Sequence, residues 1–172
     1  YRESLLPWRT NHDNVAFPLE LQKLGKEEIS RRIHEIQETC SITLNMSMFP
    51  YEMSGGQQQI IAFMQSLVTH PQLLFMDEPF SALDYETNLI LRQKLQKYHM
   101  KHKPTTVVIT HDIEEAVHLA NKIIVLSKRP TKIVSIIHNS VPYPRTIDFL
   151  VSESFHKVKD RVLSAFKKGA GL

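Results

Sequence analysis

Several residue types and patterns are scarce in this chain of 172 residues, and each scarcity excludes a class of protein. A single cysteine, Cys40, rules out a disulfide framework within the chain and fits a reducing compartment. No apolar run approaches the ~20 residues that a membrane-spanning helix needs, and the first residues do not resemble a signal peptide. The net charge of +3 is only mildly basic, so no nucleic-acid partner is expected.

Glycine is scarce as well. The chain has five glycines, and none belongs to a Gly-x-x-x-x-Gly-Lys-Ser/Thr phosphate-binding loop. The first residue is Tyr1 rather than methionine, so we expect the sequence to begin inside a longer chain. A hydrophobic content of 42% is enough for one core or for two small lobes that share one.

What the chain does contain is an apolar run that stops at two adjacent acids. The run from Leu73 to Met76 has the length of one fully buried parallel strand, and Asp77, Glu78 and Pro79 follow it directly. At the carboxyl end of a strand in an open α/β sheet, one carboxylate can hold a metal ion while its neighbour faces a reacting water. Taken alone, such a sequence is more often a turn cap followed by a solvated side chain.

A second polar motif precedes this strand. The residues Ser54, Gly55, Gly56 and Gln57 stand in front of a helical pattern of apolar residues. Ser54 is placed to cap that helix, and the glycine pair leaves the backbone N–H groups of the first turn open to an anion. The ordinary alternative is a serine cap with a Gly-Gly turn.

Helices and strands alternate along the rest of the chain. We predict helices over 25–42, from 55, over 85–102, from 113 and over 149–166, and strands over 73–76, 105–110, 122–127 and 133–137. This alternation predicts a parallel sheet with right-handed crossovers. Two successive strands then deliver Asp77, Glu78 and His111 to one sheet edge, although His111 alone would more often be a hydrogen-bonded cap.

The order and spacing of four motifs resemble the ATP-binding cassette domain of ABC transporters. The motifs are Met53 to Gln57, Leu73 to Pro79, Ser81 to Asp84, and Thr110 to Asp112. The segment from Leu5 to Phe17 is similar to the stretch that follows the Q-loop of that family. Together with Pro79 to Asp84, it is most similar to the branch that serves nitrate, sulfonate and taurine importers.

The resemblance implies an α/β fold, in which a partial P-loop NTPase-like parallel sheet core accompanies an α-helical subdomain. Residues 1–70 would form the helical signature subdomain with a residual Q-loop flank. Residues 71–140 would be part of the RecA-like core, with the Walker B strand, the D-loop and the switch histidine. Residues 141–172 would be a C-terminal helical extension.

The same resemblance assigns catalytic roles to three residues. Asp77 would be the Walker B carboxylate that organises Mg²⁺, and Glu78 would be the base that polarises the attacking water. His111 would be the switch histidine that contacts the γ-phosphate of ATP.

It also assigns residues that work across a dimer. The signature motif, which touches the nucleotide held by a second ATP-binding subunit, would be Ser54, Gly55, Gly56 and Gln57. Ser81 and Asp84 would form the D-loop that links the two sites.

The resemblance further implies an ATPase coupled to the import of a small anion or sulfonate-like solute. The complete protein would lie at the cytoplasmic face of the cell membrane, where the region around Trp8 contacts permease subunits. The residue pattern alone favours a half-buried anchor of the local fold for Trp8, the only tryptophan, over a role in gripping a partner.

Some family features are absent from the sequence. Without a phosphate loop or a Q-loop glutamine, the chain alone is expected neither to bind ATP tightly nor to hydrolyse it. Ile60 and Gln65 stand where the family usually has arginine, which is expected to weaken local packing or regulation.

The alternative function is therefore a catalytically inactive, truncated cassette that acts as a regulatory or assembly partner. A phosphate loop encoded upstream of Tyr1 would favour the ATPase, and a start codon just before Tyr1 the alternative.

Overall fold

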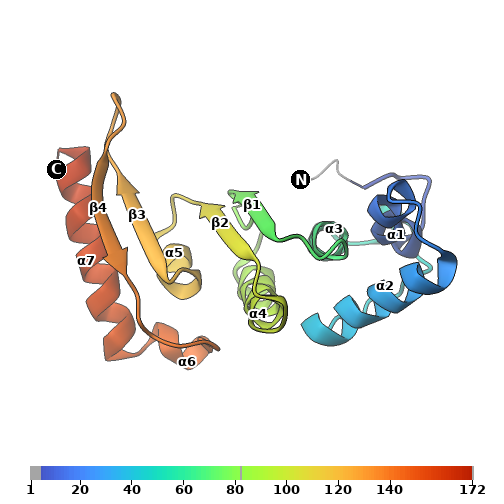
Figure 1. Ribbon diagram of the computed structural model, residues 1–172. Coiled ribbons are helices and arrows are strands. Elements are labelled where there is room, and N and C mark those ends of the chain that lie inside the picture. Colours follow the sequence, from blue (N-terminus) through green and yellow to red (C-terminus); the bar gives the residue numbers. More distant parts are fainter. Residues whose placement is uncertain (1–4, 82, 172) are drawn as a thin grey trace. The chain divides into compact units, whose positions relative to one another are not determined.

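The computed structural model describes residues 5–81 and 83–171 (Figure 1). They divide into two compact units, with the boundary between Val107 and Val108. Ala82, inside the predicted D-loop, and residues 1–4 lie outside the described residues. The elements of the first unit are α1 (Asn11–Leu21), α2 (Lys26–Cys40), the 3₁₀ helix η1 (Pro50–Glu52), α3 (Gly55–Leu67), β1 (Leu73–Asp77) and α4 (Tyr85–His102). The strand β2 (Thr105–Ile109) runs across the boundary. The second unit contains α5 (Ile113–Leu119), β3 (Lys122–Leu126), β4 (Ile133–His138), α6 (Ile147–Leu150) and α7 (Glu153–Ala170).

The helices of the first unit follow from their apolar stripes and caps. In α2, the residues Ile29, Ile33, Ile36 and Cys40 recur every three or four positions and are all buried. This stripe faces the core, since α2 packs on α1, α3 and α4. Asp84 caps α4, which spans the range predicted from the sequence.

The strands β1 and β2 are neighbours in a two-stranded sheet. The backbone N–H of Thr105 donates to the carbonyl oxygen of Gln72 at 2.9 Å, so the two strands start side by side and run in the same direction, as expected for α/β folds (Figure 1). The prediction that β1 is fully buried is wrong for the described chain. Leu74 and Met76 are buried, whereas Leu73 and Phe75 point to the other face of the sheet and are exposed.

The second unit contains a hairpin rather than a further parallel pair. The strands β3 and β4 pair antiparallel, with Lys122 opposite His138 and a bulge between Val125 and Leu126 (Figure 1). The loop that joins them is short, and a parallel connection would need a crossover of a dozen or more residues. The amphipathic helix α7 packs on both strands and buries Phe155, Val158 and Val162.

No helix in the described ranges has the length and apolar character needed to cross a membrane.

The side chain of Arg145 holds the second unit together from inside. It is 1% exposed, and its guanidinium donates to the carbonyl oxygens of Val117, His118 and Ala120 at 2.9–3.2 Å. Two more hydrogen bonds reach the carbonyl oxygen of Val141. Arg145 therefore satisfies the carbonyl groups at the end of α5, which have no partner within the helix.

We expect Arg145→Leu to destabilise the second unit by about 3 kcal/mol, because several buried carbonyl groups lose their donor. The measurement is the midpoint of urea unfolding. Arg161→Leu is the matched control, since Arg161 is exposed on α7 and its replacement should change stability by less than about 0.5 kcal/mol. Equal midpoints for the two variants would contradict the role of Arg145.

Candidate functional site

The start of α3 is an exposed helix terminus with a reciprocal cap. The hydroxyl of Ser54 accepts from the N–H of Gln57 at 3.3 Å, and the Gln57 side chain accepts from the N–H of Ser54 at 3.0 Å. The first bond within the helix runs from the N–H of Gln58 to the carbonyl of Ser54. The N–H groups of Gly55 and Gly56 therefore precede the helical ladder. Ser54 and Gly55 are exposed, so this end is open to an anion.

Thr87 joins this helix start to the start of α4. A carboxylate oxygen of Asp84 accepts from the Thr87 N–H at 2.9 Å, and the other accepts from its hydroxyl at 2.7 Å. These hydrogen bonds lower the pKa of Asp84. A Cβ at Gly56 would lie 3.1 Å from both Oγ1 and Cγ2 of Thr87, whereas a Cβ at Gly55 would meet nothing within 4 Å. Of the two glycines, Gly56 is the one that close packing requires.

The two acids stand at the end of β1. Asp77 is the last residue of the strand and is exposed, and Glu78 is half-buried. The backbone of Glu78 has φ +47, a conformation that costs a residue other than glycine about 1 kcal/mol. The N–H and hydroxyl of Ser81 both donate to the Glu78 carbonyl oxygen, at 3.3 and 3.1 Å, and hold the turn in place. Strain of this kind is concentrated at functional sites.

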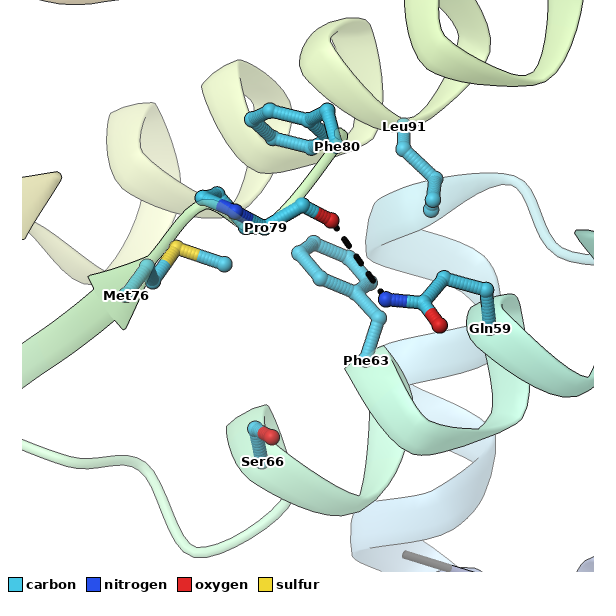
Figure 2. A pocket seen from close by; sticks show the side chains of 7 residues that line it. All are labelled: Gln59, Phe63, Ser66, Met76, Pro79, Phe80 and Leu91. Carbon is cyan, nitrogen blue, oxygen red and sulfur yellow. Dashed lines mark hydrogen bonds between the residues drawn. The ribbon is translucent and has the colours of Figure 1, made fainter. Parts of the chain in front are cut away.

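The turn after the acids packs on α3. Figure 2 shows that the Gln59 amide donates to the carbonyl oxygen of Pro79 at 3.4 Å, while Phe63 points toward Pro79. The recess between these elements has a volume of about 10 Å³ and is lined by Gln59, Phe63, Ser66, Met76, Pro79, Phe80 and Leu91. That volume holds one water molecule at most, so the recess is a packing seam that fixes the acids relative to α3.

His111 lies in the second unit, two residues after the end of β2, and is exposed. The residues on both sides of it are fixed. The hydroxyl of Thr110 donates to Glu115 at 2.7 Å and accepts from the N–H of Asp112 at 3.0 Å, and Asp112 caps α5. The approach of His111 to Asp77 and Glu78 stays a prediction.

Trp8 is 71% exposed, so the prediction of a half-buried anchor is wrong. The anchor is Asn14, which is fully buried in α1. Its side-chain oxygen accepts from the N–H of Leu6, and its NH₂ group donates to the carbonyls of Leu6, Arg9 and Thr10. The loop is therefore held by its backbone, and the indole stands outside it.

Gln65, which stands where the family usually has arginine, makes a contact of its own. Its amide donates to the carbonyl oxygen of Asn14 at 2.9 Å and links α3 to α1. The expectation that the substitution weakens local packing or regulation stays a prediction.

Sequence reasoning missed Thr87 and Gln59. The spacing of Asp84 and Thr87 is that of a helix cap and its third residue, which was a usable local signal. Thr87 also contacts Gly56, and Gln59 contacts Pro79. Both contacts join segments that are distant in the sequence, so no local sequence pattern predicts them.

The fold and the sequence are similar to those of ATP-binding cassettes. The sequence model of the ABC transporter family matches residues 2–81. A solved structure titled "Dimeric structure of a post-hydrolysis state of the ATP-binding cassette MJ0796 bound to ADP and Pi" superposes with a TM-score of 0.60 at 31% identity, covering 72% of this chain and 54% of the other. The chain is therefore similar to ATP-binding cassettes of ABC transporters in sequence and in fold.

Two curated relatives are similar to this chain over most of its length. The chain is 36% identical over 165 residues to "Aliphatic sulfonates import ATP-binding protein SsuB" of Bacillus cereus (strain ATCC 10987 / NRS 248), covering 96% of this chain and 63% of the relative. It is 36% identical over 169 residues to "Uncharacterized ABC transporter ATP-binding protein MJ0412" of Methanocaldococcus jannaschii, covering 95% and 63%. The chain thus spans less than two thirds of the length of either relative.

We expect Gly56→Ala to be less stable than Gly55→Ala by about 1 kcal/mol, because only the methyl group at position 56 crowds Thr87. Both changes gain the same helix propensity, so their difference isolates the contact. Thermal unfolding of the two variants measures it. The double change Gly56→Ala with Thr87→Ser removes Cγ2 and keeps the hydroxyl, so it should recover part of the loss. A double variant no more stable than Gly56→Ala would contradict the contact.

Proposed function

We propose that the complete protein is the ATP-hydrolysing subunit of an import system for a sulfonate-like or other small anionic solute. The observation that carries this proposal is the exposed, capped start of α3, which Thr87 fixes to the start of α4. The similarity to subunits named for aliphatic sulfonate import supports the solute class.

In this proposal, the start of α3 binds the γ-phosphate of ATP held by a second subunit. The Ser54 hydroxyl and the N–H groups of Gly55 and Gly56 are small donors that a phosphate can approach closely. Gln57 holds the cap in shape. Ser81 and Asp84, in the D-loop, fix the neighbouring turn and helix start, so that movement at one ATP site is transmitted to the other.

Asp77 and Glu78 would serve the ATP bound by their own subunit. The donor chemistry fits Mg²⁺, since Asp77 exposes a carboxylate at the end of β1 and Mg²⁺ prefers hard oxygen ligands. When bound, the ion neutralises charge on the phosphates. Glu78 accepts a hydrogen bond from the attacking water, with its position fixed by the Ser81 turn. His111 would contact the γ-phosphate.

The phosphate loop that would hold this ATP is not in the sequence. We therefore propose that the chain alone neither binds ATP tightly nor hydrolyses it. We further propose that the exposed side chains of Leu73 and Phe75 are covered in the complete protein, because apolar strand residues of α/β sheets are normally buried on both faces.

The permease would dock on the loop that carries Trp8. The indole combines a large exposed area with a backbone held by Asn14, so that little conformational entropy is lost on binding. This docking would place the protein at the cytoplasmic face of the membrane.

We expect Glu78→Gln in the complete protein to lower ATP hydrolysis by about 10²–10⁴-fold, because the amide cannot take up a proton. The dimer should then persist with ATP bound. Phosphate release and light scattering measure the two effects. Glu86→Gln, on the exposed first turn of α4, is the matched control and should keep the wild-type rate. Wild-type turnover in Glu78→Gln would exclude Glu78 as the base.

We expect Trp8→Ala to reduce recovery of the complete protein with its permease by about tenfold or more, as for a central interface aromatic. Co-purification in detergent measures this recovery. Val151→Ala removes another exposed apolar side chain, in the second unit, and should leave recovery unchanged. Full recovery of the Trp8→Ala complex would contradict docking at this loop.

A further inference from the structure

Three side chains that the proposed ATPase does not use converge in the first unit. They are Glu35 on α2, His70 in the turn after α3, and His102 at the end of α4. One ligand atom of each lies within 4.8 Å of the other two. The Nε2 atom of His70 lies 3.8 Å from one carboxylate oxygen of Glu35, and that of His102 lies 3.8 Å from the other.

Both imidazoles present a buried nitrogen to the carboxylate. Across the part of the chain that the structure describes, the Nε2 atoms of His70 and His102 have no hydrogen-bond partner. A distance of 3.8 Å is too long for a hydrogen bond to Glu35. Buried polar atoms are normally satisfied, so two unsatisfied nitrogens that face one carboxylate indicate a missing ligand between them.

We propose that Glu35, His70 and His102 bind a zinc ion or a similar late first-row divalent cation, with a fourth position left to water. Two imidazole nitrogens and one carboxylate oxygen form a known zinc donor set, with bonds of about 2.0–2.2 Å. Tetrahedral coordination at those bond lengths brings the donor atoms to roughly 3.4 Å from one another. The ligand atoms now lie within 4.8 Å of one another, so they need to approach by at most about 1.4 Å.

The surroundings hold these groups in a state that can bind metal. Burial lowers the pKa of both His70 and His102, which favours the neutral imidazole that coordinates. The ring of His102 stacks between those of Tyr98 and His70, with centroid distances of 4.5 and 4.6 Å. The Tyr98 hydroxyl donates to the carbonyl of Leu67 at the end of α3. The ends of both helices are therefore fixed around the site.

Two cationic side chains now pair with the Glu35 carboxylate, and both can move away from it. Lys101 lies 3.1 Å and Arg31 lies 3.5 Å from the Glu35 oxygens. Burial alone would raise the pKa of Glu35, but the hydrogen bond from Lys101 and the nearby charges hold it below its usual value. Both cationic side chains are about half exposed or more, so each can turn into water when a metal ion takes its place.

At this location, a bound ion would stabilise the packing of three helices. The starts of α3 and α4 meet at Gly56 and Thr87, and the ends of the same two helices meet at His70 and His102. An ion at the second meeting point would cross-link α2, α3 and α4 at the end opposite to the exposed helix start. The site is independent of whether the protein hydrolyses ATP.

The test is thermal unfolding of the chelator-treated protein with and without one equivalent of Zn²⁺, with stoichiometry from calorimetry. We expect one ion per chain and a rise in Tm of about 5 °C. Co²⁺ in place of Zn²⁺ should show the visible absorption of a tetrahedral complex. His70→Gln, His102→Gln and Glu35→Gln should each remove most of the rise.

His34→Gln is the matched control. His34 pairs with Glu38 on the exposed face of α2, at 3.1 Å, and shares no ligand with the site. This variant should keep the full response to Zn²⁺. The metal-free Tm of each variant separates loss of binding from loss of folding. No Zn²⁺ response in the wild-type protein would overturn the proposal. A response that survives in folded His70→Gln and His102→Gln would also overturn it.

Discussion

The contact of Thr87 with Asp84 and Gly56 is the constraint on which the rest of the site depends. Both carboxylate oxygens of Asp84 hold the threonine, through its N–H and its hydroxyl, and the absent side chain of Gly56 lets α3 approach it. The helix start that carries Ser54 is thereby fixed against the turn that follows the acids. Asp84 thus fixes Thr87, and Thr87 lies next to the start of α3. The proposed function needs that rigidity, because charge stabilisation of phosphoryl transfer depends on preorganised donors.

The same pair of helices is also fixed at its far end. There the rings of Tyr98, His102 and His70 form a stack, and Glu35 brings α2 against it. The helix start at Ser54 and the histidine cluster therefore lie at opposite ends of α3.

Local patterns predicted most of the helices and strands. The range of α4 follows from the Asp84 cap and the Lys103-Pro104 stop, and the acids do stand at the end of β1. Burial was predicted less well. Alternate residues of β1 are exposed. Burial of a strand depends on which other elements cover each face of the sheet, and the sequence of the strand alone does not predict them. Trp8 was misplaced for a related reason, since the anchor of its loop is Asn14, a polar residue whose four hydrogen bonds have no periodic signature. The antiparallel pairing of β3 with β4 likewise depends on the short loop between them.

The most direct test is an experimental structure of the complete dimeric protein with ATP bound. We expect the Ser54 hydroxyl and the N–H groups of Gly55 and Gly56 to lie within about 3.2 Å of the γ-phosphate held by the partner subunit. The Glu78 carboxylate should lie one water molecule away from the γ-phosphate of the ATP that its own subunit binds. A structure in which the start of α3 faces away from both nucleotides would contradict the proposed function.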